Sequence, residues 1–283
     1  MKPGSIELMS KGSVDDCMSE ENQGSKVLLI GIGADGTNTK PLPPIYDNGT
    51  FEYVPIPETQ TGTAEPMTYA NWGFAYQDTT AATYFRRIRP SKDEEWIQGD
   101  ELDNHPFHRD PNFEALTFGD KKGDNGTGRE LKKLRQGDVL GFYAGLQNEG
   151  RKHRYVIGHF TVNNVIDLEH HRGERQAELL NESPNNAHSL RFQGEGESKH
   201  DDVVIIDGTD PGGLLSRALQ ISSYDRFGSS QYYLTDDFAG EFRVRGHDPD
   251  GAEKDNKEWL GFKDPLWCDI TPKEFRSKTP ELR

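Results

Sequence analysis

The sequence contains very little cysteine, with only Cys17 and Cys268 in 283 residues. This scarcity excludes a disulfide framework and zinc sites built from paired C-x-x-C motifs. No apolar run approaches the ~18 residues that a membrane span requires, and the N-terminus lacks the basic and apolar regions of a signal peptide. We therefore expect a cytoplasmic protein in a reducing compartment, with no membrane contact.

The usual catalytic signatures are missing as well. The chain has no G-x-S-x-G elbow, no Walker lysine after a glycine loop, and no His-x-Glu with Pro-Cys-x-x-Cys of the zinc deaminases. Neither cysteine lies in a setting typical of a nucleophile. These absences leave enzymatic activity possible but identify no reaction and no cofactor.

A surplus of positive charge is also lacking. The chain carries 48 acidic and 33 basic residues, for a net charge of -15. Proteins that grip duplex DNA through many phosphates normally present a basic face. The acidic balance fits a solvated surface or a high-salt cytoplasm, and it favours a free nucleotide, a single flipped DNA base or a partner protein as the ligand over a long duplex. Basic residues do cluster locally at Arg86–Arg89 and Arg129–Arg135, which leaves a local groove open.

Composition divides the chain into three parts. Residues 1–25 are polar without an apolar period, and we expect a disordered leader. Residues 26–245 carry the apolar strands and the aromatic residues, which predicts a folded domain. Residues 246–283 are charged and rich in Gly and Asp, and we expect an acidic tail that packs on the domain as a lid or a last strand.

A glycine loop follows the first apolar run, Val27–Ile30. Gly31, Gly33 and Gly36 satisfy G-x-G-x-x-G, but the prolines at positions 41, 43 and 44 exclude the helix that must begin directly after a dinucleotide-binding loop. The same loop can still form an anion nest from backbone N–H groups and hold a phosphate. Asp35 would then orient a sugar hydroxyl or a base amine. The alternative is a tight turn in which the glycines serve only the backbone geometry and bind no ligand.

Regular elements follow from turn residues and apolar spacing. Asp47–Gly49 predicts a hairpin turn between two short extended runs. Val139–Leu146 and Arg154–Leu168 read as a buried strand and a long alternating strand. Gly208–Ser222 predicts a helix, because its apolar residues recur at helical spacing.

The densest group of chemical side chains is the segment His105–Asp110. His105, His108 and Asp110 can supply an acid and a base. Pro106 favours an extended backbone at His105, so the two imidazoles need not converge, and we assign no metal site. A hydrogen-bonding role that pins the loop is the alternative. His188 follows a polar loop and is either accessible to a ligand or simply solvated.

Several segments, taken in order, resemble the nucleotide modification associated domain, type three, a family associated with systems that make unusual DNA bases. The segments are Lys26–Pro57, Asn104–Pro111, Gly137–Leu146, Tyr155–Val162, Asn186–His188 and Tyr232–Thr235. They span most of the chain. The resemblance implies a role in nucleotide or DNA-base modification.

The helix, Leu-x-x-Gly-Asp and strand pair that begin at Gly128 resemble PUA-like barrels, the group that includes ASCH, EVE and YTH domains. In that group the barrel mouth holds a base between aromatic side chains, which here implies Phe142 and Tyr143. Alternatively, both aromatics belong to the core of an antiparallel pair. We therefore expect an α+β protein with a mixed or antiparallel PUA-like barrel core and flanking helices.

Three functions follow as hypotheses. The first is an enzyme on a nucleotide or DNA base, with His108 and Asp110 as acid and base. The second is a non-catalytic reader that stacks a modified base on Phe142 and Tyr143. The third is an adaptor in a modification or defence complex.

Overall fold

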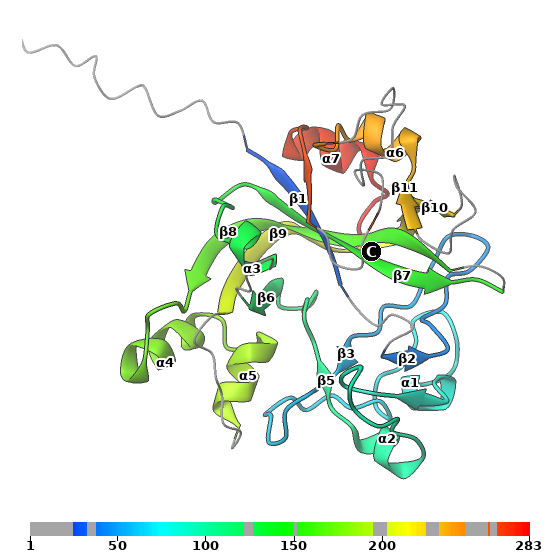
Figure 1. Cartoon of the computed structure of the whole chain (residues 1–283), viewed down its shortest axis with the longest axis vertical. Coiled ribbons are helices and arrows are strands. Elements are labelled where there is room, and N and C mark those ends of the chain that lie inside the picture. The colour runs from blue at the N-terminus through cyan, green and yellow to red at the C-terminus, as the bar shows by residue number, and fades with distance from the viewer. Residues whose placement is uncertain are drawn as a thin grey trace, which may run out of the picture.

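A curled six-stranded sheet is the frame of the molecule (Figure 1). The computed structural model describes residues 25–32, 38–121, 127–149, 152–194, 203–224, 232–246, 260 and 265–283. The strands lie in the order β12-β1-β7-β8-β9-β6. Their bounds are β1 Val27–Gly31, β6 Thr117–Lys121, β7 Val139–Gln147, β8 Lys152–Asp167, β9 Val203–Gln220 and β12 Leu266–Cys268. β1 runs parallel to β7, and the other neighbours are antiparallel.

Smaller elements surround this sheet. Three two-stranded sheets pair β2 (Thr39–Lys40) with β4 (Arg87–Ile88), β3 (Ile56–Pro57) with β5 (Phe107–His108), and β10 (Ser222–Tyr224) with β11 (Tyr232–Leu234). The helices are α1 Ala81–Tyr84, α2 Asp100–Asn104, α3 Thr127–Leu131, α4 Gly173–Glu182, α5 Ala187–Gln193, α6 Asp236–Glu241 and α7 Pro272–Lys278. Over the described ranges, no helix has the length and apolar character needed to cross a membrane.

The central strands are buried on both faces. In β1, Leu28 and Ile30 join one core cluster, while Val27 and Leu29 join another on the opposite face. Residues 38–116 cover the first face, and α6 and α7 cover the second (Figure 1). Burial on both faces explains why β1 and β7 read as continuous apolar runs instead of alternating ones.

Several predicted elements are confirmed. The strands expected at Val139–Leu146 and Arg154–Leu168 are β7 and β8. The predicted hairpin forms as well, with Ile45 bridged to Phe51. Its turn residue Gly49 has a φ of +83°, which glycine adopts at no steric cost.

The helix predicted over Gly208–Ser222 is wrong, because β9 runs through most of this segment. The apolar spacing there fits a helix and a strand equally well. In the structure, Leu214 and Ala218 face one core cluster, whereas Leu215 and Leu219 face the other. That alternation is the period of a strand. β8 supplies a partner along almost the whole length of β9, so pairing overrides the local preference.

The α+β class is confirmed, but the closed PUA-like barrel is not formed. Within the described residues the sheet ends at β12 and β6, and these two edges do not pair. Residues 38–116 fill the space that closure would enclose. Phe51 and Tyr53 from this segment pack in one cluster with Phe142 and Phe160. Side-chain packing therefore covers that face of the sheet in place of a closing strand pair.

The two ends of the chain differ in what the structure describes. The leader predicted at residues 1–25 lies outside the described residues except for Ser25. The tail predicted at residues 246–283 contains β12 and α7. β12 pairs with β1, and α7 packs Phe275 into the core.

The core contains one histidine whose titration should be visible in stability. His159 on β8 is 2% exposed, and neither ring nitrogen has a hydrogen-bond partner among the described residues. Burial, with a smaller contribution from Arg276, lowers its pKa from 6.5 to about 4. As the pH falls from 6.5 to 4, His159 becomes protonated in the unfolded chain but stays largely neutral in the folded chain. The folded state therefore loses stability relative to the unfolded state.

We therefore expect wild-type protein to lose about 3 kcal/mol more stability over this window than His159→Phe does. Urea unfolding at several pH values measures the difference. His170→Ala, which removes a histidine whose side chain is 86% exposed, is the control and should keep the wild-type pH profile. An unchanged profile in His159→Phe would contradict the assignment.

Candidate functional site

The segment from His108 to Asp110 lies beside β6 at one edge of the sheet. β5 pairs with β3, and this pairing sets His108 opposite Ile56. Both Asp110 carboxylate oxygens accept from the backbone N–H of Gly119 on β6, at 2.8 and 2.9 Å. The chain turns tightly after β5, with the Asp110 N–H donating to the His108 carbonyl at 2.9 Å, and His108 Nε2 lies 3.8 Å from Asp110 Oδ2. Both side chains are buried.

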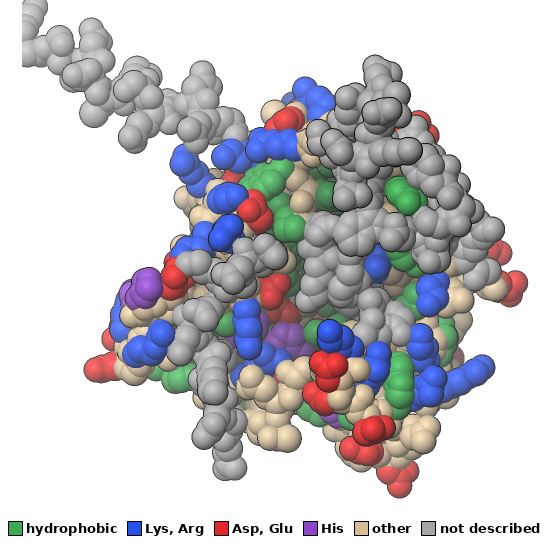
Figure 2. Space-filling model, viewed as in Figure 1, with side chains coloured by type: hydrophobic (Ala, Val, Ile, Leu, Met, Phe, Trp, Pro, Cys, Tyr) green, Lys and Arg blue, Asp and Glu red, His purple; other side chains and the backbone are tan. Residues whose placement is uncertain are grey.

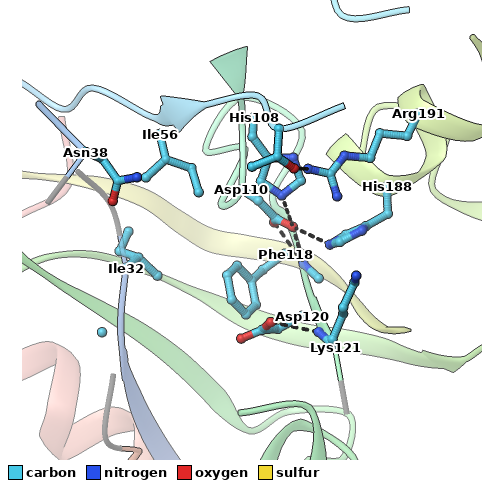
Figure 3. Close-up of a pocket in the computed structure, with 13 residues that line it drawn as sticks. Ile32, Asn38, Ile56, His108, Asp110, Phe118, Asp120, Lys121, His188 and Arg191 are labelled. Carbon is cyan, nitrogen blue, oxygen red and sulfur yellow. Dashed lines mark hydrogen bonds and ion pairs between the residues drawn. The ribbon is translucent and has the colours of Figure 1, made fainter. Parts of the chain in front are cut away.

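His188 joins this pair from α5. The Asn186 side chain caps the helix by accepting from the His188 N–H at 3.0 Å. This cap fixes the first turn and points the imidazole at Asp110, with Nε2 3.3 Å from Oδ2 (Figure 3). The rings of His108 and His188 meet edge to face, with centroids 5.1 Å apart. One polar atom of each of the three side chains lies within 4.8 Å of the others. We call this group the triad.

The triad forms part of the wall of a cavity of about 220 Å³. Figure 2 shows histidine deep in a hollow between basic and acidic side chains. The other lining residues include Gly31 at the end of β1, Asn38 directly before β2, Ile56 on β3, and Phe118, Asp120 and Lys121 on β6. The cavity thus lies where segments distant in the sequence meet.

A buried carboxylate, Glu58, supports the triad from behind. It lies directly after β3 and is 2% exposed. One oxygen accepts from His108 Nδ1 at 3.2 Å, and the Arg191 Nε bonds both oxygens at 2.9 and 3.0 Å. Burial alone would raise the pKa of Glu58, but the hydrogen bonds from His108 and Arg191 outweigh it and hold the pKa well below its usual range. Glu58 is therefore ionised.

Glu58 fixes the tautomer of His108. An ionised carboxylate only accepts hydrogen bonds, so His108 must donate from Nδ1. Its Nε2 then carries a lone pair, and this atom is the one that faces Asp110. Nε2 of His108 is therefore an acceptor nitrogen within the triad.

Burial also controls the charge of the triad. It raises the pKa of Asp110 to about 8. It lowers the pKa of His188 to about 4 and also lowers the pKa of His108. Near pH 7 Asp110 is therefore largely protonated and neither imidazole carries positive charge, so the three side chains together are nearly neutral.

Residues 26–274 match the family model described as nucleotide modification associated domain 3. The chain belongs to this family. No curated protein and no solved structure shows significant similarity to the chain. The family match covers every residue of the triad and the rest of the cavity wall.

In this family member, His105 stands apart from the triad. Its Nε2 lies 2.9 Å from the backbone carbonyl of Glu58, and it is not among the residues that line the cavity. This contact joins the start of the H-P-F-H segment to the residue that orients His108. The geometry matches the loop-pinning alternative that the sequence left open.

The residues predicted to bind a nucleotide lie in different places. Gly31 ends β1 and lines the cavity, whereas Gly33, Asp35 and Gly36 lie outside the described residues. Phe142 and Tyr143 are both fully buried on β7, and they belong to core clusters on opposite faces of the sheet. Neither lines the cavity.

Two residues that are important to the site, Glu58 and Arg191, are hard to recognise from the sequence. Glu58 gave no signal, because a single carboxylate after a proline segment resembles any loop residue. Arg191 gave a weak one: it lies three residues after His188, and this spacing places both on one face of a helix. Both residues line or support the cavity.

Removal of Glu58 should cost much more stability than removal of an exposed glutamate. Glu58→Ala leaves the buried Arg191 guanidinium without its carboxylate, and we expect a loss of about 3–5 kcal/mol. Glu114 is the matched control, since its carboxylate also bonds an arginine, Arg109, but its side chain is 81% exposed.

Glu114→Ala should change stability by less than about 1 kcal/mol. Chemical denaturation of the two variants measures both effects. Equal losses would show that the Glu58 ion pair does not hold the site together.

Proposed function

We propose that the chain is an enzyme that acts on a nucleotide or a single DNA base bound in the cavity, with the triad as its catalytic centre. The observation that carries this proposal is the convergence of His108, Asp110 and His188 on a cavity in a nucleotide modification associated domain. Paired titratable groups with strongly shifted pKa values are typical of catalytic sites. Asp110 and His188 show such shifts in opposite directions.

The size and charge of the site favour a small ligand. Its volume of about 220 Å³ lies below the ~300–1,000 Å³ of pockets that enclose drug-sized ligands. A net charge of -15 also opposes long contacts with duplex DNA. A single nucleotide, or one base turned out of a strand, satisfies both constraints.

Two cationic groups at the cavity are suited to a phosphate. Lys121 lines the cavity at the end of β6 and is exposed. Arg191 bonds Glu58 through Nε and Nη2, whereas its Nη1 makes no hydrogen bond to the described residues. Arginine and lysine are the usual phosphate ligands. Gly31, at the start of the glycine loop, lies on the same cavity.

The reader hypothesis depended on base stacking by Phe142 and Tyr143. Exposing either ring to a base would open a core cluster, so we assign the ligand to the cavity instead. Binding without turnover of any nucleotide would favour a reader. Co-purification of a partner that survives cavity substitutions would favour an adaptor.

Removal of the Lys121 charge should weaken nucleotide binding. Loss of one phosphate contact costs about tenfold in affinity, so we expect Lys121→Gln to bind 5′-nucleoside monophosphates about tenfold more weakly. Isothermal titration calorimetry measures the affinities. Lys273→Gln on α7 is the control, because it lies on the other face of the sheet. Equal affinities for Lys121→Gln and wild type would place the phosphate elsewhere.

Asp110→Asn should remove turnover while preserving the fold. The amide is isosteric and its oxygen can still accept from the Gly119 N–H, so the loop should stay in place. Positioned acid–base groups contribute about 100-fold or more to rate, and we expect at least that loss. Mass spectrometry of a nucleotide panel after incubation measures product. Wild-type turnover in Asp110→Asn would exclude the triad as the catalytic centre.

A further inference from the structure

We infer that the triad binds one divalent transition-metal ion, through Nε2 of His108, Oδ2 of Asp110 and Nε2 of His188. The role of the ion in chemistry rests on the proposed function, but its binding does not. The sequence pattern alone indicated no metal site, because His105 and His108 need not converge. The structure supplies the second imidazole from α5 instead.

The distances within the triad suit an ion. Ligand atoms that bind a metal at about 2.0–2.2 Å lie roughly 3.0–3.5 Å from one another. The Oδ2 of Asp110 is 3.3 Å from Nε2 of His188 and 3.8 Å from Nε2 of His108. The two imidazole nitrogens lie within 4.8 Å of each other, so one ring must move toward the other by up to roughly an ångström when all three atoms bind one ion.

The hydrogen bonds around the triad orient its members as metal ligands. Histidine ligands usually donate their second N–H to a carboxylate, which fixes the tautomer and strengthens the ligand nitrogen. Glu58 accepts from Nδ1 of His108 in this way. Asp110 is held by the Gly119 N–H. The lone pair of His108 Nε2 and the carboxylate oxygen of Asp110 thus face each other, an arrangement that requires a proton or a cation between them.

A cation in the triad would also suit a phosphate-bearing ligand. Glu58 and Arg191 neutralise one another, and the described cavity wall also carries Lys121 and Asp120, whose charges are opposite. A divalent ion in the triad would add positive charge at the point where the nucleotide must enter.

The donor set selects the class of metal. Two imidazoles and one carboxylate suit zinc, iron, cobalt or nickel, whereas magnesium and calcium prefer oxygen ligands alone. Three protein ligands on the wall of a cavity leave further coordination positions open, as catalytic sites do. We therefore expect an ion that contacts the bound nucleotide directly or through water.

Metal titration of the full chain tests this inference. Protein treated with chelator and then dialysed is titrated with Co²⁺, whose visible absorption reports its ligands, and with Zn²⁺ by calorimetry. We expect one ion per chain. His108→Gln, Asp110→Asn and His188→Gln should each lower the affinity at least about 100-fold, because each replaces one of three direct ligands with a weaker one and even an outer-shell partner is worth about 10- to 100-fold. His170→Gln, on an exposed histidine, should leave it unchanged.

Circular dichroism confirms that each variant is folded, and Glu58→Gln adds an independent check. It keeps all three ligands but weakens the support of His108, so affinity should fall about 10- to 100-fold without loss of stoichiometry. Wild-type protein that takes up no Co²⁺ or Zn²⁺, or folded triad variants that bind as tightly as wild type, would overturn the inference.

Nucleotide titrations of the same samples separate this inference from the proposed function. Metal uptake without nucleotide binding would uphold the metal site and refute the proposed function. Tight nucleotide binding and turnover in chelated protein that takes up no metal would refute the metal site and uphold the proposed function.

Discussion

The buried carboxylate of Glu58 is the constraint on which the site depends. It bonds His108 from β5 and Arg191 from α5, residues that lie 50 and 133 positions away in the chain. Its own neighbours hold it in turn, since the N–H groups of Thr59 and Gln60 donate to it at 2.6 and 2.9 Å. An ion buried this deeply is stable only with such complete pairing. The segments that meet at Glu58 are therefore fixed relative to one another, and His108 and His188 with them.

The large sheet gives this junction a rigid base. β1 and β7 are buried on both faces, and β6 extends the sheet to the edge where Gly119 anchors Asp110. Because the sheet is not closed, residues 38–116 can pack on one face and carry β3 and β5 to that edge. The cavity forms between the edge strand and the packed segment. The same open architecture that contradicts a barrel thus creates the site.

Local signals predicted local structure well. Apolar runs located β1, β7 and β8, and the Asp47–Gly49 turn located the hairpin, because each depends on neighbours in sequence. β9 was mistaken for a helix because its apolar spacing suits both periods and only the partner strand decides between them.

The site was only partly predictable for the same reason. His108, Asp110 and His188 were recognisable as reactive side chains, but their convergence depends on a helix cap and a strand edge far apart in the chain. Glu58 has significance only through the partners that folding brings to it.

The central claim is that the cavity beside the triad receives a nucleotide. The most direct measurement is a crystal structure of the protein grown with a 5′-nucleoside monophosphate. We expect phosphate density beside Lys121 and Arg191, with the base or sugar against His108, Asp110 and His188. A nucleotide ordered at another surface, with this cavity filled only by water, would contradict the account.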